Sequence, residues 1–171
     1  MKKITLIALS FALIWQVNAQ TLENFPQRKN ELKLDVAYLL GATLKAEYEY
    51  LINDWSSVGV SAFHNFNSGN PSFRTQVLGI YRLYFGKEPA TGFFLEGNIG
   101  LVSGYWYRYA WWHYSYEQYT AGGVGIALGW KWYIPRSGIV LDIFLGGGRL
   151  LGDNDYTRSY PRMGIAVGKR F

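Results

Sequence analysis

The sequence predicts an all-β protein: an eight-stranded antiparallel up-and-down β-barrel that crosses a membrane with its strands. Three observations lead to this fold class. Eight segments alternate between apolar residues and small, polar or charged ones, with the period of two that is typical of strands. Their polar faces are rich in glycine, as expected for strands that enclose a narrow interior. The connections between the segments alternate between short and long, as in outer-membrane barrels.

The amino terminus has the organisation of a secretory signal. Two lysines precede an apolar stretch that ends in small residues at Ala19, so residues 1–19 are expected to be removed during export. Residues 20–30 are then a short periplasmic segment, and the barrel spans 31–171. The chain contains no cysteine, which excludes disulfides and a cysteine-linked lipid anchor. No later segment reaches the roughly 20 consecutive apolar residues of a membrane-spanning helix, so only strands are expected to cross.

The first four alternating runs lie within residues 31–85. Their apolar faces are Leu32, Leu34, Val36, Tyr38 and Leu40 in the first, Leu44, Ala46, Tyr48 and Tyr50 in the second, Val58, Val60 and Ala62 in the third, and Phe73, Val77, Tyr81, Leu83 and Phe85 in the fourth. Asn53 and Asp54 indicate a turn between the second and third runs. Leu78 and Ile80 interrupt the polar face of the fourth run.

The last four runs lie within residues 93–170. Their apolar faces are Phe93, Leu95, Ile99 and Leu101, then Val124, Ile126, Leu128, Trp130 and Trp132, then Ile139, Leu141, Ile143 and Leu145, and finally Met163, Ile165 and Val167. The segments GKEPAT and IPRSG contain the proline and glycine that are typical of turns. The sequence therefore predicts a short connection before the fifth run and another after the sixth run, both at the same end of the barrel.

A soluble β-sandwich, with the apolar faces packed together, is the alternative fold. The polar faces favour the barrel, because small residues suit a narrow interior and the charges of both signs nearly balance, so that they can pair inside. The predicted ionic network of the lumen comprises Lys33, Asp35, Lys45, Glu47, Glu49, Arg74, Arg82, Glu96, Lys131, Asp142, Arg162 and Arg170. The long connections near 64–72, 103–118 and 149–158 are then expected on the outer side of the membrane.

The end of the chain carries a further signal. GIAVGKRF finishes on Phe171, with Ile165 and Val167 on the same face, and resembles the segment that the outer-membrane assembly machinery reads, although Lys169 stands where an aromatic residue is usual. With YEY in the second run, YRLYF in the fourth and YPRMGIAVGKRF at the close, residues 30–171 resemble the small eight-stranded outer-membrane barrels of the OmpA/OmpX type, most closely a family of short barrels of unknown function. This resemblance implies a fold and a membrane, and no chemistry.

The segment YWYRYAWWHYSY, residues 105–116, contains eight tyrosines and tryptophans. The fifth run continues into this segment and the sixth run begins in it, so together they predict a long hairpin. Its two strands are longer than the ~9 to 11 residues of a tilted spanning strand, so the tip of the hairpin is expected to rise above the membrane. Tyrosine and tryptophan anchor strands at membrane interfaces, and they also suit ligand binding because each ring combines apolar area with a polar edge. Both interpretations stay open, and the candidate surface-binding residues are Trp106, Trp111 and Trp112.

Catalytic and metal chemistry find little support. His113, Ser115 and Glu117 supply the groups of a hydrolytic triad, and HYS resembles the His-x-Ser element of outer-membrane enzymes that deacylate lipid A. Residues two apart on a strand are ~7 Å apart, too far for direct hydrogen bonds, so no catalytic residue is assigned. Two histidines and no cysteine predict no metal site, and no cofactor is expected. A lumen filled by paired charges predicts no open pore.

The expected function is therefore structural or surface-interacting, in the cell outer membrane, without enzymatic activity. A lipid-modifying enzyme and a secreted soluble β-barrel that binds a ligand are the alternatives. The expected partners are outer-membrane lipid, lipopolysaccharide and the assembly machinery that contacts the Phe171 segment. The formal net charge of +5 falls by two when Lys2 and Lys3 leave with the signal, and the remaining charges are scattered, so no nucleic-acid partner is expected. The chain is expected to be monomeric.

Overall fold

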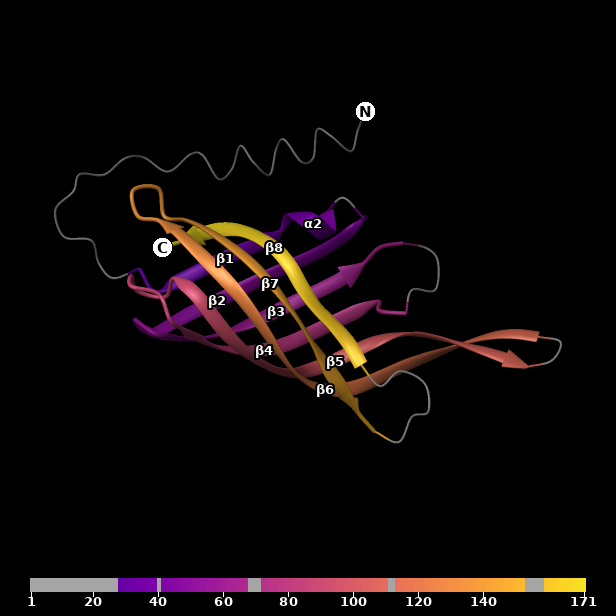
Figure 1. Ribbon diagram of the computed structural model, residues 1–171. Coiled ribbons are helices and arrows are strands. Elements are labelled where there is room, and N and C mark those ends of the chain that lie inside the picture. Colours follow the sequence, from indigo (N-terminus) through magenta and orange to yellow (C-terminus); the bar gives the residue numbers. More distant parts are fainter. Residues whose placement is uncertain (1–27, 40, 68–71, 111–112, 153–158) are drawn as a thin grey trace, which may run out of the picture.

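The computed structural model describes residues 28–39, 41–67, 72–110, 113–152 and 159–171, and for 107–110 and 113–115 it describes the backbone alone. The predicted signal 1–19 and all but the last three residues of the segment 20–30 lie outside the described residues. Eight antiparallel strands form a closed barrel in chain order, as the sequence predicts (Figure 1). The elements are β1 (Asn30–Asp35), α2 (Val36–Leu39), β2 (Thr43–Asn53), β3 (Ser56–Asn65), β4 (Thr75–Tyr84), β5 (Gly92–Ala110), β6 (His113–Ile134), β7 (Ile139–Leu151) and β8 (Ser159–Arg170).

The barrel has two unlike ends, which Figure 1 makes plain. At one end, here called the terminal end, β1 begins and β8 finishes, and the first and last strands close the barrel with Glu31 opposite Arg170. Connections at this end are short: 54–55, 85–91 and 135–138. At the other end, here called the hairpin end, β5 and β6 extend beyond their neighbours. Within the described residues, no helix has the length and hydropathy needed to cross a membrane.

Two expectations about the hairpin end were wrong in detail. Residues 103–118, predicted as a long connection, are mostly strand, because β5 and β6 pair without interruption up to Ala110 and His113. The first run does not continue to residue 40 as a strand. It ends at Asp35, whose Oδ1 accepts a hydrogen bond from the backbone N–H of Ala37 at 3.2 Å. This local bond offers the backbone an alternative to the strand ladder, and the chain turns into the single helical turn α2.

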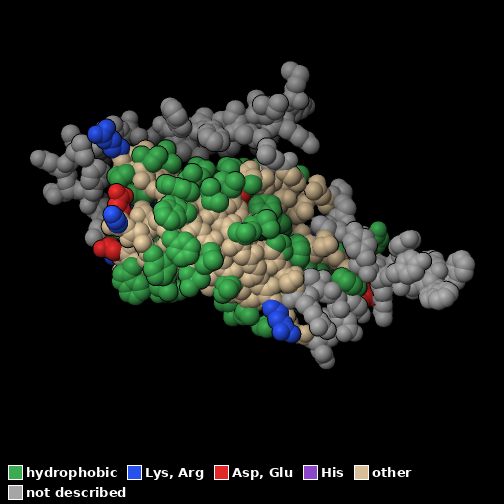
Figure 2. Space-filling model, in the orientation of Figure 1, with side chains coloured by type: hydrophobic (Ala, Val, Ile, Leu, Met, Phe, Trp, Pro, Cys, Tyr) green, Lys and Arg blue, Asp and Glu red, His purple; other side chains and the backbone are tan. Residues whose placement is uncertain are grey.

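The barrel is apolar outside and polar inside. On β2, the alternating residues Tyr48 and Tyr50 are 44% and 41% exposed, whereas Glu47 and Glu49 are almost fully buried. The same alternation holds along the other strands, and Figure 2 shows hydrophobic side chains spread over the outer wall. The soluble sandwich is thereby wrong, because its apolar faces would pack against one another. Here they point away from the lumen, which holds the charges.

Lumen-facing glycines make room for this polar interior, and Gly164 on β8 gives the sharpest case. A Cβ at this position would collide with Asp35 Oδ2 and would stand 2.8 Å from the Phe144 ring and 2.9 Å from Lys45 Nζ. We expect Gly164→Ala to lower the free energy of unfolding by about 1 to 3 kcal/mol through overpacking. Gly97→Ala is the matched control, since nothing lies within 4 Å of its Cβ. Urea titrations in lipid vesicles measure both, and equal losses would contradict the packing argument.

Candidate functional site

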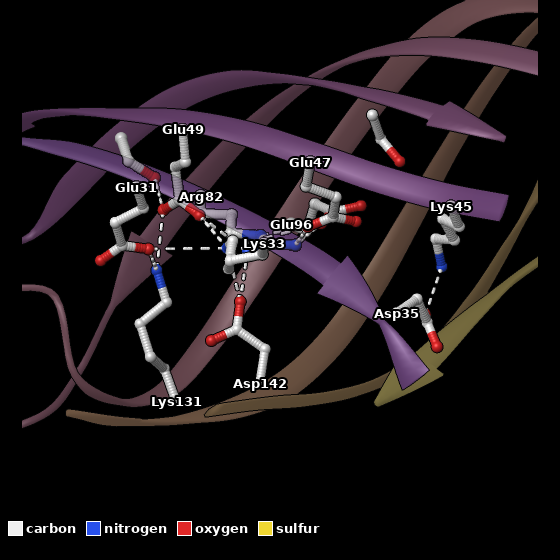
Figure 3. A network of polar contacts seen from close by, with 12 residues as sticks. Glu31, Lys33, Asp35, Lys45, Glu47, Glu49, Arg82, Glu96, Lys131 and Asp142 are labelled. Carbon is white, nitrogen blue, oxygen red and sulfur yellow. Dashed lines mark hydrogen bonds and ion pairs between the residues drawn. The ribbon is translucent and has the colours of Figure 1, made fainter. Parts of the chain in front are cut away.

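The interior of the barrel holds one connected network of buried charges, which Figure 3 shows in part. The alternation of each strand directs these side chains inward, and seven strands contribute. Its basic members are Lys33, Arg82, Lys131, Arg162 and Arg170. Its acidic members are Glu31, Glu47, Glu49, Glu96 and Asp142. The network therefore balances five positive charges against five negative ones.

Arg82 on β4 lies at the centre of this network. Its guanidinium donates to four carboxylates, at 2.8 Å to Glu96, 2.8 Å to Asp142, 2.9 Å to Glu49 and 2.9 Å to Glu47. The fork of the guanidinium suits such multiple contacts, which a compact ammonium group cannot make. The ring of Phe94 covers the guanidinium at 4.6 Å, and Arg82 is fully buried. Loss of one partner would therefore leave a buried charge uncompensated.

Two lysines extend the network from β1 and β6. Lys33 donates to Glu49 at 2.5 Å and to Asp142 at 2.6 Å. Lys131 donates to Glu31 at 2.7 Å and to the hydroxyl of Tyr84 at 2.6 Å, and that hydroxyl in turn donates to Glu49. These contacts link residues that are up to 109 positions apart in sequence, so they depend on closure of the barrel.

The predicted set and the structure differ at three places. Glu31 belongs to the network but was not predicted, although the alternation of the first run places it on the same face as Lys33. Asp35 and Lys45 form a separate pair at 3.2 Å, nearer the hairpin end. Arg74 was expected in the lumen network, and this was wrong. It precedes β4, where the alternation no longer fixes its direction.

Arg74 instead supports the base of the projecting hairpin. Its Nη1 donates to the hydroxyl of Tyr105 at 2.6 Å, and the guanidinium stacks over the same ring at 5.4 Å. Nearby, the hydroxyl of Tyr119 donates to the carbonyl of Ser72 at 2.7 Å. The residues before β4 thereby hold both strands of the hairpin where it leaves the barrel wall.

Apolar clusters occupy the lumen toward each end. Toward the terminal end lie Leu51, Tyr84, Ala90, Phe94, Phe144 and Ala166, and toward the hairpin end lie Leu78, Ile80, Val102, Ala121, Leu150 and Tyr160. Leu78 and Ile80, which interrupt the polar pattern of the fourth run, belong to the second cluster. Eight strands leave an interior of the size that side chains can occupy, and these two clusters lie in it together with the charged network.

The hairpin projects as a two-stranded ribbon. β4 pairs with β5 only as far as Ser103, and β7 pairs with β6 only as far as Gly122. Within the described residues, 104–110 and 113–121 therefore pair with each other alone. Trp106 is half-buried on this ribbon. Trp111 and Trp112 lie outside the described residues.

The described residues do not show the side chains of the possible catalytic set close to one another, and they do not show a metal site. The side chains of His113 and Ser115 are outside the described part, and Glu117 is exposed on the ribbon. Among the described residues, no group of three or more histidine, cysteine, aspartate or glutamate side chains is arranged to hold a metal ion.

Solved structures include barrels similar to this one. The N-terminal β-barrel domain of Pseudomonas aeruginosa OprF matches with a TM-score of 0.50 and 17% identity, covering 85% of this chain and 98% of that one. The Yersinia pestis outer membrane protein Ail, in a phospholipid bilayer nanodisc, matches with a TM-score of 0.45 and 15% identity, covering 85% and 100%. No family model and no curated protein matches the chain. The fold is that of the small outer-membrane barrels of the OmpA/OmpX type, and the likeness carries no activity.

Proposed function

We propose that this chain is an exported outer-membrane barrel that serves as a structural and surface-interaction protein, without catalysis and without an open pore. The apolar outer wall supports the membrane location, because water would penalise such a surface on a soluble protein, and hydrocarbon accepts it. The buried network and the apolar clusters at both ends support the absence of a pore. Lipid and lipopolysaccharide then surround the wall, and the assembly machinery contacts the segment that ends at Phe171.

The projecting hairpin carries the surface-interaction part of the proposal. The carbonyl groups of Phe93 and Ser103 accept hydrogen bonds from the β4 side of β5, at 2.8 Å each. Because backbone groups alternate in direction along a strand, the odd-numbered residues of β5 direct their N–H and C=O groups to that side. On the ribbon, Tyr107 and Tyr109 therefore present backbone groups at an edge that has no neighbour among the described residues.

A free strand edge is a template for another extended chain. The proposed partner is an extended segment of a protein outside the cell, which adds to the edge of β5 as a further strand. Backbone hydrogen bonds supply the affinity in this mode of recognition, and side chains supply the selectivity. The aromatic composition of residues 105–116 fits that second role, because large rigid rings bury area at low cost in entropy.

Substitution of the edge tests this role. Tyr107→Pro removes one edge N–H and is tolerated there, because proline is compatible with a strand whose N–H faces solvent. We expect it to weaken binding of reduced, alkylated α-lactalbumin, a protein that offers extended segments, by about fivefold, the worth of one lost hydrogen bond. Tyr107→Ala, which keeps the N–H, is the matched control.

Biolayer interferometry on protein in lipid nanodiscs measures the binding, with native α-lactalbumin as the folded control. Equal loss in Tyr107→Pro and Tyr107→Ala would assign the binding to the side chain and reject strand addition. Equal binding of folded and unfolded α-lactalbumin would also reject it.

A further inference from the structure

A cavity lies at the terminal end of the barrel, opposite the hairpin. It has a volume of about 600 Å³, within the range of small-molecule sites. Five segments that are distant in sequence meet around it: the residues before β1, the end of β2 with its turn, the β4–β5 turn, the end of β6 with its turn, and the end of β8. No residue of the hairpin is among the described lining of this cavity.

The floor of the cavity is closed by the β4–β5 turn. The backbone N–H of Ala90 donates to the carbonyl of Asp54 at 2.6 Å. Arg170 donates to the carbonyls of Pro89 and Ala90, at 3.0 Å each, and to Glu31 at 2.7 Å. Ala90 is fully buried as a result. The cavity is therefore a blind pocket at the mouth of the barrel and not the entrance of a channel.

The walls combine positive charge with aromatic surface. Arg28, Lys29 and Arg170 line the cavity, and Asp54 is the one acidic residue among its described lining. The guanidinium of Arg170 stacks over the ring of Tyr133 at 4.1 Å. Trp55, which is 58% exposed, adds a broad apolar face. The positive charge of the lining attracts an anion, and its aromatic surface favours a ligand that also carries an apolar group.

The positions of the three cations of the lining indicate which kind of anion the cavity suits. A multiply charged phosphate is best held by several arginine forks that converge on one point. Here Arg170 spends donors on Glu31 and on two carbonyls, and the other two cations lie on the short segment before β1. A single carboxylate attached to an apolar or aromatic group fits better, with the charge beside the cations of the lining and the apolar group against Trp55.

We propose that this cavity binds a small peptide-like molecule with a free carboxylate and a bulky apolar side chain. The ligand reaches it from the side of the membrane where β1 begins and β8 finishes, so this site is independent of the surface role proposed for the hairpin. The probe is acetyl-leucyl-phenylalanine, and its carboxamide is the matched control, identical in apolar area and lacking the charge. Inorganic phosphate tests the competing class of anion.

Calorimetric titration of the mature chain in lipid nanodiscs measures binding. We expect the acid to bind, and both the amide and phosphate to bind at least about tenfold more weakly. The double variant Arg28→Gln/Lys29→Gln is expected to weaken binding of the acid by about three- to tenfold, because it removes two half-buried positive charges from the lining. Lys87→Gln, which removes an exposed cation from the β4–β5 turn outside the lining, is expected to leave it unchanged.

Trp55→Ala tests the apolar wall of the cavity, and it is expected to weaken binding of the acid and binding of the amide by the same factor. The proposal is overturned if the amide binds as tightly as the acid, if phosphate competes equally, if the double variant binds like the unmodified chain, or if the acid does not bind at millimolar concentration. Heat-modifiable migration on a gel verifies that each variant is a folded barrel.

Discussion

Arg82→Met is expected to lower the free energy of unfolding by at least about 3 kcal/mol, the usual cost of removing one partner of a buried ion pair. The substitution removes the positive charge that Glu47, Glu49, Glu96 and Asp142 share. It leaves five carboxylates facing four cations in a fully buried layer. Folding titrations with urea in phosphatidylcholine vesicles measure the loss.

Two variants make this prediction specific. In Arg82→Met/Asp142→Asn the network regains equal numbers of opposite charges, so the double variant is expected to lose less stability than the sum of the two single variants. Arg74→Met removes an arginine of the same kind from the hairpin base, where its partner is the neutral hydroxyl of Tyr105, and is expected to cost about 1 kcal/mol. Additive losses in the double variant would mean that the charges do not act as one network.

The sequence alone predicts the eight strands and their facing because alternation is local. A residue such as Glu49 needs only its neighbours Tyr48 and Tyr50 to show which way it points. The same reasoning fails where the ladder ends. Asp35 bonds to the backbone two residues on, and Arg74 stands before its strand, so neither the strand limit nor the direction of the side chain follows from alternation.

The partners inside the lumen could not be predicted from the pattern. Lys33 and Asp142 meet because β8 lies between their strands and closes the barrel, a relation that no short stretch of sequence encodes. The cavity at the terminal end could not be predicted for a similar reason. Arg28, Trp55 and Tyr133 are unremarkable in sequence, and they become neighbours only through the ends of separate strands. The balance between positive and negative charges in the lumen could be anticipated from the residues on the polar faces. Which charge pairs with which depends on the register between the strands.

Leu145→Arg is expected to destabilise the barrel by about 2 to 4 kcal/mol in a lipid bilayer, because its side chain faces the hydrocarbon. Leu145 is 66% exposed, and it stands opposite Leu128 on one side and Met163 on the other, at the middle of the β6–β7 ladder. Arginine there would carry its charge to the depth where no water can solvate it.

Depth is the variable that separates this cost from an ordinary surface substitution. Ile134→Arg is the matched control, since Ile134 is 53% exposed and ends β6 at the terminal end, where a membrane interface is expected and the same charge costs about 0 to 1 kcal/mol. Urea titrations in vesicles compare the two variants directly. Equal costs at the two positions would contradict the view that hydrocarbon surrounds the outer wall. In water or at an interface, both arginines would be solvated equally well. A cost that grows from Ile134 at the terminal end to Leu145 at the middle of the wall requires a solvent that becomes less polar toward the middle of the barrel, and the bilayer is the solvent with that property.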